Sequence, residues 1–448
     1  MRTLWVGTYP PAGIGTPAGR GEGIYRVALD PATGALGEPV RVVETPAPSF
    51  VVLRGDVLYA TDESDAGAVA ALRVHDDLLE PLGTAPSGGT YPCHLLADDG
   101  WLYVANYGDG ALGALRLAPD GSLVADEPPV VLTHAGSGPH AERQGGPHAH
   151  FVALAPGEHL LVVDLGTDQI RRYARTPAGP VPAGIAAAFP PGTGPRHLAF
   201  AQLPGGPATG GSRGVPGGEW WAYVSGELDP TVHALSWDPT TDTGTVTQTL
   251  PALPTLSPLP TLPTTTPRRT RQFGAIPAVP AAGLDTNCRA RREGGAGGEG
   301  GERGAGGAGG EGERAGGGLR GDLRAVWAAA EGEASPSHLA LDGDELVLAV
   351  RGAGMLARFV VRPGGLVDRR ADQLLPASTP RHFAVVDGWT VVAEQVPGAI
   401  TVLDREGTVV SSVPVPSAAS VAPGNVAPGN VAPASSAPVE PEAATPAR

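Results

Sequence analysis

The sequence predicts an all-β fold, a seven-bladed β-propeller whose four-stranded blades surround a central channel. Three observations support it: a repeat with a period of about 44 residues, apolar β-rich runs separated by turns that contain Gly, and almost no helical periodicity. The chain has 448 residues, a length that suits one large all-β domain. A single repeat unit cannot bury its apolar face alone, so the repeat predicts a closed ring of neighbouring blades.

Two phrases make up the repeat. The first is Pro, any residue and then His or Phe, followed by an apolar run; its copies begin at Pro48, Pro92, Pro147, Pro195, Pro336 and Pro380. The second is an apolar strand, and its seven copies span residues 4–9, 58–63, 102–107, 161–165, 223–227, 348–351 and 391–395. The copy at 4–9 has no leading strand of its own. We therefore expect the C-terminal region to complete that blade and close the ring.

Two segments fall outside the repeat. A Pro/Thr run and a Gly/Glu/Arg tract lie within about 247–330, and an Ala/Pro-rich sequence occupies 417–448. Such sequences bury too little apolar area to offset the entropy cost of ordering the backbone. We therefore expect a propeller over 1–416, a disordered insert at about 247–330 and a flexible tail at 417–448.

Composition narrows the function classes. The chain carries 31 basic and 46 acidic side chains, a net charge of −15, which argues against a nucleic-acid or membrane partner. Its two cysteines, Cys93 and Cys288, cannot form a disulfide framework, and no Cys-x-x-Cys pair suggests zinc. The apolar stretch near Met1 is too short for a signal peptide or a membrane span. We expect a cytoplasmic protein that is a monomer or a weak homodimer.

Equivalent blade positions single out candidate residues for chemistry. The residue that ends the second phrase is, blade by blade, Tyr9, Glu63, Tyr107, Leu165, Glu227, Arg351 and Gln395. A structural repeat needs no charge there, so Glu227 and Arg351 are the first candidates for a site in the channel. Arg196 would join Arg351 as a clamp for a carboxylate or phosphate. Beside such arginines Glu227 should stay ionised and could act as a general base.

The repeated histidines have mainly a structural interpretation. His94, His150, His197, His338 and His382 recur at the same place in the phrase. His150 differs, because a polar, Gly-rich loop at 134–148 enlarges its unit alone and is a natural wall for a site. The pair His148 and His150 lacks further ligands at recognisable spacing, so we expect no metal and no other cofactor.

Several phrases occur together in one order: Val6-Gly-Thr-Tyr9, Leu102-Tyr-Val-Ala-Asn-Tyr107, Pro147-His-Ala-His150, Gly194-Pro-Arg-His197 and Glu227-Leu228. In this order the chain resembles the lactonase family of seven-bladed β-propellers, the bacterial 6-phosphogluconolactonase type. The same fold includes a fungal carboxymuconate-lactonising cyclase.

The resemblance implies a catalytic set of His150, Arg196, Glu227 and Arg351, and substrate binding by His148, Arg143 and Asn106. It implies hydrolysis of a small-molecule sugar-acid lactone without a metal, as in 6-phosphogluconolactone hydrolysis in the pentose phosphate pathway. Arginines would hold the substrate's phosphate or carboxylate and stabilise the oxyanion. Either His150 or Glu227 would activate water, and this choice stays open.

Two alternatives remain at this point. A muconate-type lactonising cycloisomerase would use the same pocket for a dicarboxylate. A non-catalytic propeller scaffold would instead bind a protein or peptide, and an exposed aromatic patch on one rim would favour it.

Overall fold

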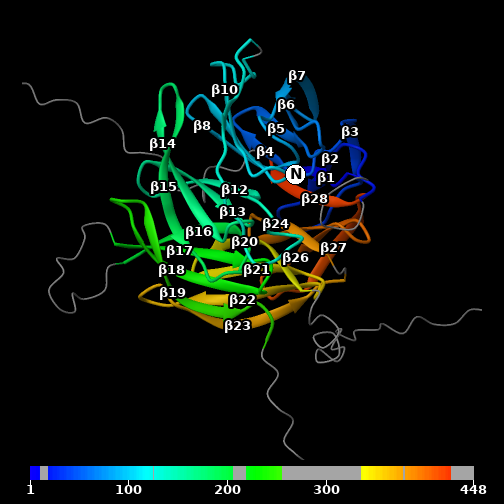
Figure 1. Cartoon of the computed structure of the whole chain (residues 1–448). Helices are drawn as coiled ribbons and strands as arrows, with labels where there is room; N and C mark the ends of the chain where they lie inside the picture. Colours follow the sequence, from blue (N-terminus) through cyan, green and yellow to red (C-terminus); the bar gives the residue numbers. More distant parts are fainter. Residues whose placement is uncertain (11–18, 125, 205–217, 255–333, 377–378, 425–448) are drawn as a thin grey trace, which may run out of the picture. The chain divides into compact units, whose positions relative to one another are not determined.

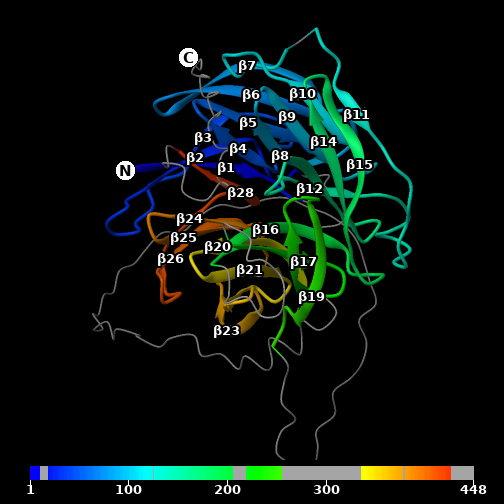
Figure 2. The ribbon, with the colours of Figure 1, turned by 90° about the vertical axis from the view of Figure 1, so that its left-hand side faces the viewer.

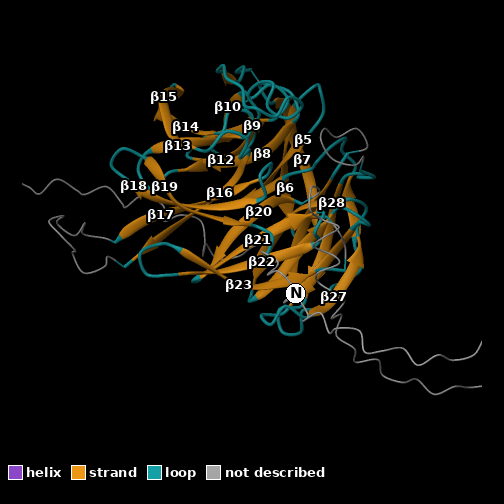
Figure 3. Ribbon diagram, turned by 60° about the horizontal axis from the view of Figure 1, so that its bottom comes forward, coloured by secondary structure: helices purple, strands orange, loops and turns teal. Residues whose placement is uncertain are grey.

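The computed structural model describes residues 1–10, 19–124, 126–204, 218–254, 334–376 and 379–424. In this part the chain forms seven four-stranded antiparallel sheets and no helix (Figures 1 and 3). The predicted seven-bladed propeller is therefore confirmed. The described residues hold no helix long and apolar enough to cross a bilayer.

Each blade runs outward from an inner strand. Blade 1 is β28 (Ala418–Pro423), β1 (Arg2–Thr8), β2 (Ile24–Leu29) and β3 (Val40–Val43). Blade 2 is β4 (Val51–Arg54), β5 (Val57–Asp62), β6 (Ala68–His75) and β7 (Leu78–Pro86). Blade 3 is β8 (Pro92–Asp98), β9 (Trp101–Asn106), β10 (Leu112–Arg116) and β11 (Val130–Leu132). Blade 4 is β12 (Ala149–Leu154), β13 (His159–Asp164), β14 (Gln169–Thr176) and β15 (Gly179–Ala188).

The remaining three blades follow the same order. Blade 5 is β16 (Pro195–Leu203), β17 (Glu219–Gly226), β18 (Thr231–Asp238) and β19 (Thr243–Pro251). Blade 6 is β20 (Ser335–Asp342), β21 (Glu345–Arg351), β22 (Met355–Val361) and β23 (Val367–Leu374). Blade 7 is β24 (Pro380–Val386), β25 (Trp389–Glu394), β26 (Ala399–Leu403) and β27 (Val409–Pro414).

The inner strands close a ring. Each of them contacts the inner strand of the next blade, and β24 of blade 7 contacts β28, which in turn contacts β4. Strand β28 pairs antiparallel with β1, with Val421 opposite Val6, so the C-terminal strand completes the N-terminal blade as predicted. In Figures 1 and 2 the red β28 accordingly lies beside the blue β1. Closure in this way pairs an edge of β1 that would otherwise be open.

The core is divided among the blade interfaces. Each pair of neighbouring blades in the described ring encloses one apolar cluster, such as the one around Tyr223 of blade 5 and Phe359 of blade 6. Strand β28 contributes Val421 to one cluster and Ala422 to another, so its loss would expose two clusters at once.

The boundary predicted at residue 416 is wrong by one strand. The Ala-rich β28 lies beyond it, and its Ala418 and Val421 are buried in the cluster between blades 1 and 7. Its Ala/Pro composition resembles the tail, but alternate side chains meet apolar partners on both sides. The predicted insert boundary near 247 is also early, since β19 continues to Pro251. Residues 255–333 and 425–448, where the rest of both segments falls, lie outside the described residues.

Ring closure predicts opposite outcomes for two truncations. A chain that ends at Pro416 loses β28, which exposes the edge of β1 and two apolar clusters, and burial of Val421 alone is worth about 1.5–3 kcal/mol. A chain that ends at Gly424 keeps every described strand. We expect chemical denaturation to show a large loss of unfolding free energy for the shorter chain and a value within about 0.5 kcal/mol of wild type for the longer one. Equal stability of the two would contradict closure by β28.

Candidate functional site

An irregularity at the start of the inner strands shapes the channel. In blades 3 to 7 the ladder between the inner and second strands shifts register there, for example between Pro92 and His94. Such β-bulges re-aim side chains. As a result, consecutive residues face the same cavity: Arg196 with His197, and Arg381 with His382.

The second residue of each such pair contributes to an aromatic ring across the channel. Its members are Phe50, His94, Phe151, His197, His338 and His382. Neighbouring ring centroids lie between 4.0 Å (His94 to Phe151) and 5.8 Å (Phe50 to His382), so the six rings contact one another all the way round. We call this set the aromatic ring.

The register corrects one grouping made from the sequence. His150 was counted among the repeated histidines, but Phe151 occupies their position, opposite Val163 of the second strand. The phrase in blade 4, Pro147-His-Ala-His150, is one residue longer than Pro92-Cys-His94. His150 therefore lies one position earlier, equivalent to Cys93, and its Nδ1 is 3.9 Å from the Cys93 Sγ.

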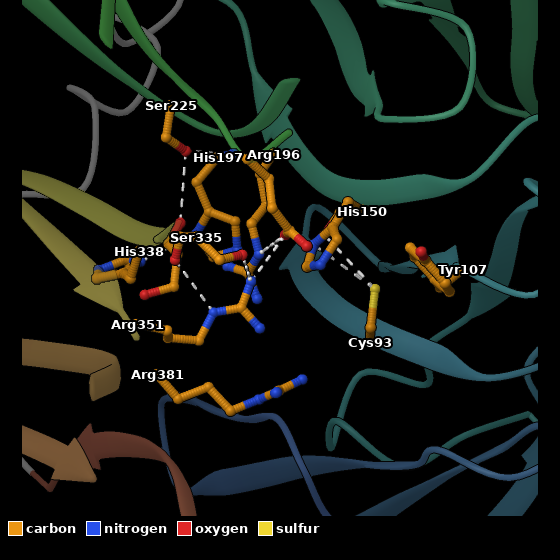
Figure 4. A network of polar contacts seen from close by, with 12 residues as sticks. Cys93, Tyr107, His150, Arg196, His197, Ser225, Ser335, His338, Arg351 and Arg381 are labelled. Atoms are coloured by element: carbon orange, nitrogen blue, oxygen red, sulfur yellow. Dashed lines mark hydrogen bonds and ion pairs between the residues drawn. The ribbon is translucent and has the colours of Figure 1, made fainter. Parts of the chain in front are cut away.

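Arg196, the first residue of one such pair, belongs to a charged cluster centred on Glu227. Glu227 directly follows β17 and is 4% exposed. Its Oε2 is 2.7 Å from Nε of Arg196 and 3.0 Å from Nη2 of Arg351. Its Oε1 accepts a hydrogen bond of 2.7 Å from Nη2 of Arg143. We call these four residues the Glu227 cluster; Figure 4 shows Arg196 and Arg351 side by side within it.

The electrostatics of the cluster favour an ionised carboxylate. Burial alone would raise the pKa of Glu227, but the three guanidinium groups hold it well below its usual value. Burial, together with the neighbouring Arg351, lowers the pKa of Arg196 to about 9, which leaves it charged at neutral pH. Three positive groups around one carboxylate leave a surplus of two charges, which suits an anionic ligand.

His150 stands beside this cluster in its neutral form. It is 7% exposed, and burial, followed by the charge of Arg196, lowers its pKa well below the usual value. The ring makes edge contacts with Tyr107 at 5.6 Å and with His197 at 5.5 Å. A neutral imidazole at neutral pH is able to accept a proton.

The enlarged loop 133–148 supplies Arg143 to the cluster. Nε of Arg143 donates to the Tyr107 hydroxyl at 3.0 Å. Gln144 anchors the loop by donating to the Leu165 carbonyl at 2.9 Å, and His134 bonds to Asp164. The structure thus places this loop, expected from the sequence to be a wall, directly against Glu227.

The other predicted binding residues lie at different distances from the cluster. His148 stacks on the Tyr107 ring at 4.6 Å, and its Nδ1 bonds to the Tyr107 carbonyl at 2.6 Å, so it lies at the edge of the site. Asn106 is not brought into the cluster. Its amide is fully buried and bonds to Ser87 and Ala111, which fixes the turn after β9.

Sequence reasoning did not choose two charged residues that face the same channel. The guanidinium of Arg381 lies 4.0 Å from the Tyr9 ring centroid and donates to Gln395 at 3.0 Å. Glu63 is 5% exposed and accepts a hydrogen bond from Ser49. Its place at the strand-end position was the available signal. Across the described residues, no three His, Cys, Asp or Glu side chains gather as a metal site.

The aromatic ring predicts acid sensitivity. Burial lowers the pKa of His382 to about 3, and burial with the charges of neighbouring residues lowers those of His94, His197 and His338 well below the usual value. The unfolded chain therefore binds protons below about pH 6.5 that the folded ring does not accept. The resulting stability is present above pH 6.5 and is lost as the pH falls toward 3.

His382→Phe tests this linkage, because Phe50 and Phe151 already occupy equivalent positions. Near pH 5 we expect the slope of unfolding free energy against pH to decrease by about 1.4 kcal/mol per pH unit relative to wild type. Phe359→Leu, a buried substitution that removes no titratable group, is the matched control and should keep the wild-type slope. An unchanged slope in His382→Phe would show that this group is not held neutral.

Comparison with known proteins agrees with this architecture. The family model described as "Lactonase, 7-bladed beta-propeller" matches residues 3–265. The 6-phosphogluconolactonase of Bacillus subtilis (strain 168) is 34% identical over 244 residues, which are 53% of this chain and 62% of that protein. A probable 6-phosphogluconolactonase of Arthroderma benhamiae is 28% identical over 240 residues, 51% of this chain and 57% of that protein. The match thus spans about three fifths of these relatives' length.

Solved structures share the fold. A putative 6-phosphogluconolactonase from Bacteroides fragilis NCTC 9343 has a TM-score of 0.64 at 22% identity and covers 95% of this chain and 98% of its own. The periplasmic gluconolactonase PpgL of Pseudomonas aeruginosa has a TM-score of 0.66 at 22% identity, with 95% and 99% covered. The family model covers more than half of the chain, and the resemblance inferred from the sequence is confirmed: this protein belongs to the lactonase family of seven-bladed β-propellers.

Proposed function

We propose that this protein hydrolyses the ring ester of an anionic sugar-acid lactone, with 6-phosphogluconolactone as the leading substrate. The Glu227 cluster beside a neutral His150 is the observation that supports it. Its surplus positive charge suits both the substrate's anionic group and the oxyanion of an ester transition state. Two relatives that carry the name 6-phosphogluconolactonase, one of them as probable, agree with this choice.

His150 is the better candidate for the base. The oxygens of Glu227 are already occupied by ion pairs with three guanidinium groups, whereas His150 is neutral and forms no ion pair in the described part of the chain. The neutral imidazole of His150 accepts a proton from water as the water oxygen attacks the lactone carbonyl carbon. The carbonyl electron pair moves to oxygen, where the guanidinium groups of Arg196 and Arg351 stabilise it. Collapse of this intermediate breaks the ring C–O bond and yields the free acid.

Glu227 then has an orienting role. A guanidinium is planar, and ion pairing fixes the direction of its remaining N–H groups. Arg351 is held twice, since its Nη2 also donates to the Ser335 Oγ at 2.7 Å. Donors fixed before the substrate arrives need no reorganisation during the reaction.

The physiological setting belongs to the same proposal. We infer a small-molecule enzyme of carbohydrate metabolism, acting at the lactone step of the pentose phosphate pathway in the cytoplasm, as a monomer or weak homodimer without nucleic-acid or membrane partners. The name of the Bacillus subtilis relative and the acidic composition support it.

The test is lactone hydrolysis measured above the spontaneous rate. We expect wild type to prefer 6-phosphogluconolactone over an unphosphorylated gluconolactone. Arg196→Ala should lower kcat/KM by on the order of 10² to 10³, because an oxyanion donor is lost. His150→Ala should lower it by on the order of 10² to 10⁴, because the base is lost.

Arg362→Ala is the matched control, since it removes an exposed guanidinium paired only to Asp368 among the ion pairs of the described chain. It should retain the wild-type rate, and melting temperatures would establish that all variants fold. A wild type without activity on either lactone would refute the hydrolase. Turnover of a carboxymuconate instead would assign the pocket to the lactonising cycloisomerase.

A further inference from the structure

A small cavity is lined by Arg196 of the Glu227 cluster and by three members of the aromatic ring, Phe50, His197 and His382. Its volume is about 20 Å³, enough for one water molecule. The residues that line it and carry its chemistry are Ser49, Glu63, Cys93, His150, Arg196 and Arg381. In Figure 4, His150 and Arg381 approach this space from different sides of the channel. The proposed reaction assigns no role to the carboxyl group of Glu63.

Glu63 is the counterpart of Glu227 in blade 2. Both directly follow the second strand of their blade, and both donate their backbone N–H to the residue before the inner phrase, Ala47 and Gly194 respectively. The surroundings differ, however. The ion pairs of Arg143, Arg196 and Arg351 go to Glu227, whereas Glu63 accepts a hydrogen bond from the Ser49 hydroxyl.

The groups that face Glu63 come from four other elements. Arg381 lies on β24, Arg196 on β16, Cys93 on β8 and Tyr9 after β1. Burial raises the pKa of Glu63, and the charges of the two arginines and the hydrogen bonds of Ser49 and Tyr9 offset this only in part. The pKa of Glu63 is thus raised and that of Glu227 is lowered. Two carboxyl groups with pKa values shifted apart in this way can take different roles, one as a proton donor and the other as a base or a fixed negative charge.

We propose that Glu63 is the general acid of the reaction and donates its proton to the ring oxygen of the lactone as that oxygen leaves. This role rests on the proposed lactone hydrolysis. When the tetrahedral intermediate collapses, the ring C–O bond breaks and its electron pair moves to the ring oxygen. That oxygen takes the carboxyl proton of Glu63 and becomes the hydroxyl of the product. The proton that His150 took from water passes through the cavity to Glu63. This returns His150 to its neutral form and Glu63 to its protonated form.

The neighbours of Glu63 are poorer donors. Burial raises the pKa of the Cys93 thiol, which opposes loss of its proton. The guanidinium groups must stay charged to stabilise the oxyanion. A carboxyl group whose pKa is raised by burial, and which lines the same cavity as His150 and Arg196, is the better match to a developing alkoxide.

Glu63→Gln tests the role, with Glu394→Gln as the matched control. Glu394 is also a buried carboxyl group that accepts a hydroxyl hydrogen bond, but its partner Thr401 lies within blade 7. We expect kcat/KM on 6-phosphogluconolactone to fall by on the order of 10² to 10⁴ in Glu63→Gln only. Wild-type activity should also fall as pH rises through the pKa of Glu63, and this alkaline limb should vanish in Glu63→Gln and persist in Glu63→Asp.

An infrared measurement decides the protonation state without any turnover. The C=O stretch of a protonated carboxyl group should disappear from the neutral-pH spectrum of Glu63→Gln relative to wild type. Unchanged kcat/KM and pH profile, or an unchanged spectrum, would overturn the proposal. A wild type inactive on lactones would overturn the hydrolase and this role together, and the spectrum would still show whether Glu63 carries a proton.

Discussion

The channel depends on the extra residue at the start of the inner strands. Side chains of a regular strand alternate between faces, so Arg196 and His197 could not both reach the channel from an unbroken β16. The bulge brings both to one cavity. The register shift in blades 3 to 7 thus lets Arg196 and Arg381 face the same cavity as the members of the aromatic ring that follow them in sequence.

The aromatic ring determines the polarity of the surroundings of the Glu227 cluster. Six rings in mutual contact, four of them imidazoles held neutral, offer little stabilisation to a charge above them. In such surroundings a buried carboxylate needs a positively charged partner. Buried ion pairs nevertheless add little to the stability of a fold, since replacing them with apolar residues often leaves the free energy of unfolding unchanged or increases it. Three guanidinium groups around Glu227 are therefore better explained by binding and chemistry than by stability.

The sequence was informative wherever the signal was local. Apolar runs and turns recur in every blade, so the propeller and its closure could be predicted, and comparison of equivalent positions pointed to Glu227 and Arg351. Register was not accessible, because it depends on which residues pair across a bulge; His150 was grouped one position out for this reason. Composition misled at β28, whose alanines resemble a tail until their partners in blades 1 and 7 are known.

The ring also explains how the pKa values of two buried glutamates in one channel can be shifted in opposite directions. Like-charged carboxylates at contact distance would titrate as a coupled pair. Glu63 belongs to blade 2 and Glu227 to blade 5, which is as far apart as two blades of a seven-membered ring can be. Glu63 accepts a hydrogen bond from Ser49, whereas Glu227 is surrounded by three guanidinium groups, of which Arg196 also acts on Glu63. The seven blades place residues at equivalent positions around the channel. Because these residues belong to different blades, their side chains can have different roles toward one substrate.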